Sequence, residues 1–89
     1  MTWPANDGDA GRHVFLIEMD AGPDALVRAL GPFALHDARV VGLGLDHGDD
    51  RMRLRVEAAG VCADLARRLG LKLEALPSVR AVGVGWTCA

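Results

Sequence analysis

The sequence predicts an α+β sandwich in which two helices cover one face of a four-stranded antiparallel sheet. Three observations predict it. The chain has 89 residues, which suits one domain with a modest core. Segments with strand and helix periodicity follow one another in the order strand, helix, strand, strand, helix, strand. Two right-handed crossovers around a central hairpin then give the βαββαβ arrangement of ferredoxin-like folds, with the first and third strands central.

The first strand is expected at 13–20, a nearly continuous apolar run with β-branched and aromatic members. Such a run is typical of a strand that is central in a sheet or buried on both sides. A turn at Ala21 and Gly22 follows. Pro23 then suits the first helical position, and Asp24 suits the first turn because a carboxylate there faces the positive end of the helix dipole.

The first helix has one apolar stripe and one interruption. The stripe consists of Ala25, Leu26, Ala29, Leu30 and Phe33, which recur at helical spacing. Pro32 lacks an N–H group and its ring clashes with the carbonyl of Arg28. We therefore expect a kink or a broken turn before His36 and Asp37.

A hairpin follows the first helix. The strand 38–46 has Val41, Leu43 and Leu45 on one face and Val40, Gly42 and Gly44 on the other. Residues 47–50 form the turn, and the strand 51–58 alternates strictly. That alternation directs Met52, Leu54 and Val56 inward and Arg51, Arg53, Arg55 and Glu57 outward.

The second helix and last strand complete the domain. The helix is expected within 61–76, with an apolar stripe formed by Leu65, Leu69, Leu73 and Leu76. Pro77 and Ser78 end it, and 79–86 reads as a strand with Val82, Val84 and Trp86 on one face and Ala81, Gly83 and Gly85 on the other. The domain is therefore assigned to 13–87, after a flexible leader over 1–12 that is rich in Gly, Asp and Asn.

Composition and charge exclude several classes of protein. The chain is 51% hydrophobic and 25% charged, as in ordinary globular proteins. Its formal net charge of -2 disfavours a nucleic-acid binder, which needs clustered Lys and Arg. No apolar run approaches the length of a membrane span and no signal pattern opens the sequence, so we expect a cytoplasmic protein that does not contact a membrane.

Titratable residues are too scattered to predict an active site. Cys62 and Cys88 lie far apart without metal-ligand spacing, so we expect buried or incidental thiols and no metal. His13, His36 and His47 fall on three separate elements and are expected to be plain surface residues. With no catalytic constellation, the sequence predicts neither an enzyme nor a cofactor.

Two surface features have both a plain and a functional interpretation. Arg51, Arg53 and Arg55 place three like charges on one sheet face, which is either a solvated surface or a docking surface for an acidic partner. Glycines at 42, 44, 83 and 85 leave the outward face of two expected edge strands without side chains. Such a surface is either simple tolerance at an edge or an interface in a dimer or larger assembly.

The pattern resembles the ACT domain, a ferredoxin-like regulatory module, and within it the small regulatory subunits of acetolactate (acetohydroxyacid) synthase. The resemblance runs from about Ile17 through Leu45 and more loosely to Val84. It is carried by "EMDAGPDALVRALGPF" at 18–33, "RMRLRVEA" at 51–58 and "LARRLGLKLEALPSVRAVGV" at 65–84. It implies an ACT-like fold and a regulatory role.

The resemblance also implies a ligand site in the turn after the first strand. The family-equivalent positions are Ala21, Asp24 and Arg39, within a turn that also includes Asp20 and Gly22. Members that respond to valine carry Asn, Gly and Asn at the three positions. Asp24 would repel a ligand carboxylate, so the usual valine response is not expected.

Short single-domain members of this family also carry an acidic residue at the position of Asp24. The resemblance therefore implies a non-catalytic small subunit that forms a homodimer and binds and activates the thiamine-diphosphate-dependent catalytic subunit of acetolactate synthase, in branched-chain amino-acid biosynthesis. Arg51, Arg53 and Arg55 are the expected partner contacts. The alternative is a stand-alone ACT-like domain that senses an amino acid or another small metabolite. A small enzyme is a third, least favoured reading.

Overall fold

The computed structural model describes residues 12–36 and 38–87 and contains four strands and two helices in the predicted order. The bounds of the elements are β1 Arg12–Asp20, α1 Ala25–Leu35, β2 Arg39–His47, β3 Arg51–Ala59, α2 Ala63–Glu74 and β4 Val79–Thr87. The predicted leader over 1–12 falls outside the described residues except for Arg12, with which β1 begins.

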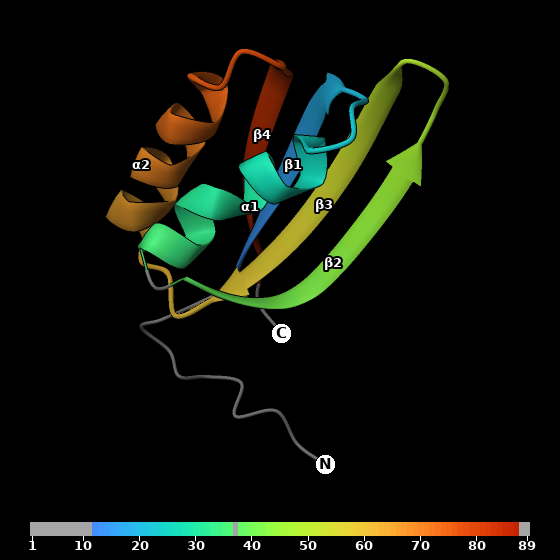
Figure 1. Cartoon of the computed structure of the whole chain (residues 1–89). Coiled ribbons are helices and arrows are strands. Elements are labelled where there is room, and N and C mark those ends of the chain that lie inside the picture. Colours follow the sequence, from blue (N-terminus) through green and yellow to red (C-terminus); the bar gives the residue numbers. More distant parts are fainter. Residues whose placement is uncertain (1–11, 37, 88–89) are drawn as a thin grey trace.

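The strands form one antiparallel sheet in the order β2-β3-β1-β4. Both helices lie on the same face of this sheet, and the opposite face is open (Figure 1). The predicted fold is therefore confirmed, with β1 and β3 central and β2 and β4 at the edges. This strand order is the one that two crossovers around a central hairpin produce, because each crossover helix returns the chain to the same sheet as the strand before it.

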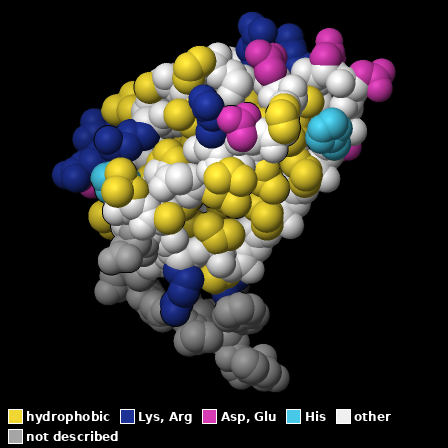
Figure 2. Space-filling view, viewed as in Figure 1, with side chains coloured by type: hydrophobic (Ala, Val, Ile, Leu, Met, Phe, Trp, Pro, Cys, Tyr) yellow, Lys and Arg dark blue, Asp and Glu magenta, His cyan; other side chains and the backbone are white. Residues whose placement is uncertain are grey.

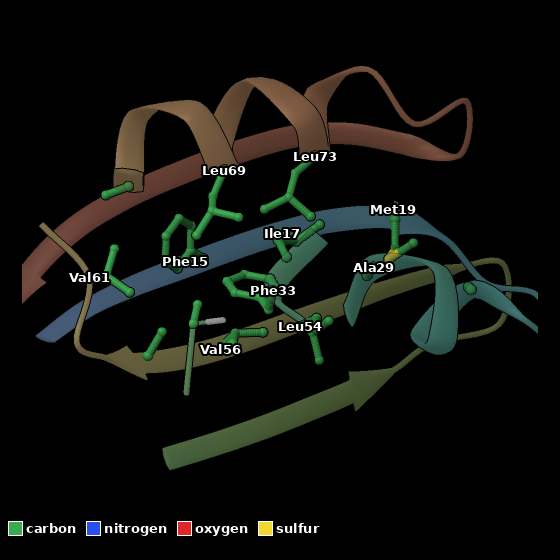
Figure 3. Packing of buried hydrophobic residues seen from close by; sticks show 14 of the residues in the cluster. Phe15, Ile17, Met19, Ala29, Phe33, Leu54, Val56, Val61, Leu69 and Leu73 are labelled. Carbon is green, nitrogen blue, oxygen red and sulfur yellow. The ribbon is translucent and has the colours of Figure 1, made fainter. Parts of the chain in front are cut away.

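The core lies between the sheet and the helices. Phe15, Ile17 and Met19 of β1 and Met52, Leu54 and Val56 of β3 are buried toward the helices, as the alternation predicts for β3. Figure 3 shows Leu69 and Leu73 of α2 and Phe33 of α1 pointing into this layer. Phe33 and Phe15 make a T-shaped contact, with ring centroids 4.9 Å apart and an interplanar angle of 82°. This geometry suits the opposite charges of ring faces and edges.

Helix α1 differs from the prediction at its start and in its middle. It begins at Ala25, because the Ala25 N–H donates to the Gly22 carbonyl and holds Pro23 and Asp24 in a turn. The predicted break at Pro32 is wrong, since α1 continues through this residue to Leu35. Phe33 is 1% exposed, and its burial anchors the turn that Pro32 weakens.

Strand β2 contains a bulge that the alternation did not predict. Leu43 and Leu45 pair with Val56 and Leu54 on the helix side, as expected, but the register shifts between Val40 and Gly42. The shift places Val40 opposite Ala58, on the helix side rather than with the glycines. One extra residue in a strand reverses the face of everything before it.

The central position of β1 does not bury both of its faces. Leu16 is 54% exposed on the open face, where its register neighbours are Arg55 of β3 and Gly83 of β4. Of the two alternatives expected for 13–20, a central strand is therefore confirmed, and burial on both sides does not hold at Leu16. The open face has no covering layer of helices within the described residues, although Val14, near the start of β1 on that face, is buried.

Candidate ligand-binding turn and exposed edge strand

The turn between β1 and α1 is tied to two neighbouring loops. The Asp20 N–H donates to the Ser78 carbonyl at 2.8 Å, and the Ala21 N–H donates to the Asp50 carbonyl at 3.0 Å. The first hydrogen bond joins the β1–α1 turn to the α2–β4 loop, and the second joins it to the hairpin turn between β2 and β3. The predicted site residues Asp20, Ala21 and Gly22 therefore occupy one fixed end of the sheet.

Asp20 is held by arginines from two strands. Arg80 donates to it through two nitrogens, Nε at 2.9 Å and Nη2 at 3.1 Å, and Arg51 lies 3.9 Å away. The hydrogen bonds from Arg80 are the main cause of a lowered pKa for the Asp20 carboxyl group, and the charge of Arg51 adds to it. Asp20 is therefore a structural ion-pair partner that joins β1 to β4.

Acid is expected to destabilise the fold through Asp20. A folded-state pKa below the ordinary value of 3.8 means that the unfolded chain takes up the proton first as pH falls. The stabilisation is complete above about pH 5 and is lost as pH falls through the unfolded value of 3.8 and then through the lowered folded-state pKa. Urea unfolding between pH 6 and pH 2.5 should show a shallower acid decline in Asp20→Asn than in the wild type.

A matched control is Asp46→Asn, which removes a carboxylate from the open face that makes no ion pair with any described residue. Its acid decline should follow the wild type. Equal slopes for the wild type and Asp20→Asn would show that the pair with Arg80 does not couple folding to pH.

Asp24 does not lie in the first turn of α1, where the sequence predicted it. It is the N-cap of α1 rather than a first-turn residue, and its side chain makes no capping hydrogen bond. Its carboxylate instead accepts a hydrogen bond from Arg28 Nε at 2.8 Å. Both side chains are about 60% exposed, so this pair contributes little stability, but it partly offsets the charge that Asp24 presents to a ligand.

Arg39 lies at the opposite end of the sheet from this turn. It pairs with Ala59, whereas His47, at the other end of β2, pairs with Met52 beside the turn. Eight residues of strand separate the two ends, which is about 26 Å. The structure therefore brings Asp20, Ala21, Gly22 and Asp24 together and leaves Arg39 apart from them within one copy.

The predicted arginine row lies on the open face of the sheet. Glu18 of β1 is 3.4 Å from Arg53 and 4.0 Å from Arg51. Arg55 is exposed and makes no ion pair with any residue in 12–36 or 38–87. Carboxylates of β1 thus form ion pairs with two of the three arginines, and Arg55 remains available to an acidic group of another molecule.

Four of the exposed large apolar residues in the described part of the chain lie together along β2. Its four large apolar side chains are between 37% and 50% exposed, namely Val40, Val41, Leu43 and Leu45. Figure 2 shows apolar side chains gathered over β2 and the adjoining side of α1. This edge strand has no Lys or Pro, and its charged residues Arg39 and Asp46 lie toward its ends, so its central apolar stretch is open to pairing with another strand.

One prediction about the histidines is wrong. His13 is buried rather than on the surface, since it is 6% exposed beneath the start of α2. Burial lowers its pKa, and hydrogen bonding to the Val61 backbone partly offsets this effect. His36 is half-buried and His47 is exposed. Cys62, expected to be a buried or an incidental thiol, is exposed at the N-cap of α2, so only the second alternative remains for it.

Neither a metal site nor a membrane span is found in the described part of the chain. No three His, Cys, Asp or Glu side chains there come together to hold an ion. No helix in 12–36 or 38–87 has the length and apolar character needed to cross a membrane. Cys88 lies outside the described residues.

Comparison with known proteins identifies the fold. No family model matches the sequence, and no curated protein sequence matches it. Among solved structures, the C-terminal domain of the MgtC protein from Mycobacterium tuberculosis is similar, with a TM-score of 0.72 and 20% identity over 93% of this chain and 94% of that one. The crystal structure of the ACT domain from GTP pyrophosphokinase of Chlorobium tepidum gives 0.75 and 15% over 84% and 97%.

The solution structure of the same Chlorobium domain gives a TM-score of 0.71 and 15% identity, over 82% of this chain and 83% of that one. The predicted ACT-like fold is therefore confirmed. At these identities the likeness concerns the fold, and function has to be argued from the surfaces.

Proposed function

We propose that this protein is a non-catalytic, ACT-like sensing domain that binds a small metabolite between two copies paired along β2. The apolar surface of β2 is the observation that carries the proposal. Leu43 and Leu45 lie on the helix side of the sheet but beyond the cover of the helices, so each stays about half exposed. Burying such side chains against a second copy provides the driving force for pairing.

The β2 surface suits an antiparallel pair. A twofold axis at Leu43 places this residue beside its counterpart, and Leu45 faces the bulged segment at Val40 and Val41 of the second copy. On the open face it sets Gly42 beside Gly44, where neither residue has a side chain to obstruct close approach. The two sheets then join into one, and the contact closes after two copies because it uses the same surface twice.

The same pairing completes the candidate ligand site. An antiparallel partner brings its Arg39 beside His47, at the end of β2 that adjoins the turn containing Ala21 and Asp24. Arg39 of the second copy thus comes to the same end of the joined sheet as the turn, about 14 Å from it across β2 and β3, instead of lying at the opposite end. The guanidinium of Arg39 could hold a ligand carboxylate that Asp24 alone would repel.

Ligand binding should appear as stabilisation of the paired protein. In a thermal-shift screen of the twenty amino acids, at least one should raise the melting temperature, because a ligand at 100 times its Kd adds about 2.7 kcal/mol. Asp24→Gly should strengthen the response by removing a like charge from the ligand carboxylate. Arg39→Ala should weaken it.

Glu74→Gln serves as the control, because Glu74 is an exposed carboxylate at the end of α2, which packs over β4 and not over β2. Its response should match the wild type. A flat screen for the wild type and Asp24→Gly together would rule out an amino-acid sensor.

A finer proposal is that the domain activates the catalytic subunit of acetolactate synthase. Its support is the sequence resemblance, together with Arg55, which faces outward with no ion pair to any described residue and fits an acidic partner. Added protein should change the acetolactate-forming rate of the large subunit from the same source, and Arg55→Glu should abolish the change. Arg28→Glu, on α1, should not. Absence of both co-elution and rate change would refute this partner.

A further inference from the structure

A second exposed surface lies at the opposite edge of the sheet, between α2 and β4. It is a groove of about 350 Å³, which we call the α2–β4 groove. Ala63, Arg67, Leu71 and Glu74 of α2 form one wall, and Val82 and Val84 of β4 form the other. Leu71 is 61% exposed and Val84 is 45% exposed, so two apolar side chains face solvent beside a free strand edge.

The edge of β4 is open to another strand. Within the described residues β4 pairs only with β1, so every second residue directs its N–H and C=O groups away from the sheet. Gly83 and Gly85 present no side chain on the open face. Arg80 is the single charged residue of β4, and its guanidinium is engaged by Asp20. The edge therefore lacks the charges that usually prevent strand addition.

Two opposite charges mark the rim of the groove. Arg67 uses one nitrogen for Asp64 at 3.0 Å and keeps further donors free, and Glu74 makes no ion pair with any described residue. Seven helical residues separate them, which is about 10.5 Å. In an added strand, two residues that share one face and are four positions apart lie about 13 Å from each other. Long side chains can make up the difference between this spacing and that of Arg67 and Glu74.

His13 closes the end of the groove near Ala63. Its Nδ1 is buried and has no hydrogen-bond partner among the described residues. An unpaired buried ring nitrogen is costly, and a ligand group brought within hydrogen-bond distance of it would relieve that cost.

From these observations we propose that β4 takes up an extended segment of another polypeptide as a fifth, antiparallel strand. The segment carries an acidic side chain opposite Arg67, an apolar side chain between Leu71 and Val84, and a basic side chain opposite Glu74. Main-chain hydrogen bonds to β4 supply affinity, and the alternate side chains that enter the groove supply specificity.

A different polypeptide, rather than a second copy, is the occupant at this edge. This choice rests on the proposed function: if copies already pair along β2, self-pairing along β4 as well would extend the sheet without limit instead of closing it. The apolar surface of β2 suits a symmetric contact between two copies. The groove along β4 has a positive end and a negative end, so it suits a single strand that binds in one orientation.

The test is titration of an acetylated, amidated Thr-Glu-Thr-Val-Thr-Lys-Thr peptide into the ¹⁵N-labelled full chain, followed by amide NMR shifts. The shifts should concentrate on Gly83, Val84, Gly85 and α2 and leave β2 unchanged. A peptide with Glu and Lys exchanged should bind more weakly. Arg67→Glu should weaken binding about fivefold, as expected for an exposed charge contact that is reversed.

Arg68→Glu is the matched control. Arg68 is also exposed, is also 3.0 Å from Asp64 and carries the same charge, but it does not line the groove. It should leave peptide binding unchanged. Equal losses in the two variants, shifts centred on β2, or no shifts at millimolar peptide would overturn the proposal. Concentration-dependent shifts of β4 amides without peptide would assign this edge to a second copy and would also overturn it. Peptide binding needs no β2 pairing, so each proposal can fail separately.

Discussion

Replacement of Phe33 by alanine is expected to lower the free energy of unfolding by about 3 to 5 kcal/mol. Phe33 is 1% exposed and its ring meets Phe15 edge to face, so the substitution removes apolar burial and an aromatic contact and leaves a cavity. It also removes the anchor beside Pro32, where α1 lacks a backbone hydrogen bond. Urea unfolding at fixed protein concentration measures the loss.

Val27→Ala provides the control for this prediction. Val27 lies on the same helix and is 71% exposed, so its truncation should change the free energy of unfolding by no more than about 0.5 kcal/mol. A cost below about 1 kcal/mol for Phe33→Ala would mean that α1 is not held to the sheet by this side chain.

Replacement of Leu43 by lysine is expected to make the protein monomeric. Each pair loses two apolar side chains at its centre and gains two adjacent positive charges on the twofold axis. The loss of burial alone is worth about 3 kcal/mol or more, so the Kd for pairing should rise about a hundredfold or more. Analytical ultracentrifugation over a range of concentrations measures this change.

The fold of the single copy should survive Leu43→Lys, because this side chain is half exposed and a lysine is well tolerated on an edge strand. Leu71→Lys is the matched control, since Leu71 is also an exposed apolar residue but lies on α2, over the other half of the sheet. It should leave the molar mass unchanged. A monomer in the wild type, or equal effects of the two variants, would refute pairing at β2.

The sequence predicts the elements with strong periodicity best. The strict alternation of β3 places Met52, Leu54 and Val56 in the core, and the helical spacing of α2 buries Leu69 and Leu73. These predictions succeed because one face of each element has to be dry, and the pattern of apolar residues records which face it is.

Predictions failed where long-range contacts override the local pattern. The bulge in β2 depends on how this strand meets β3, and no local signal at Val40 or Val41 specifies it. Pro32 is tolerated because Phe33 is buried against residues distant in sequence. His13 is buried because the loop before α2 crosses over it, which a view of 13–20 alone does not reveal.

The candidate site could be predicted only in part. The resemblance selects the turn at Asp20 to Asp24, and the structure gathers these residues at one end of the sheet. The salt bridge from Arg80 to Asp20 joins residues 60 positions apart, so it follows from the pairing of β1 with β4 and not from local sequence. The separation of Arg39 from this turn likewise follows from the strand order and could not be predicted from local sequence.

The central claim is that two copies meet along β2. Isotope-filtered NMR on an equal mixture of ¹³C-labelled and unlabelled protein tests it directly, because it detects only contacts between copies. The pairing predicts contacts of Leu43 methyl groups with Leu43 of the second copy, and of Leu45 with the bulged segment at Val40 and Val41. Contacts between copies that involve α2 or the open face of the sheet, or none at concentrations where the protein is dimeric, would contradict it.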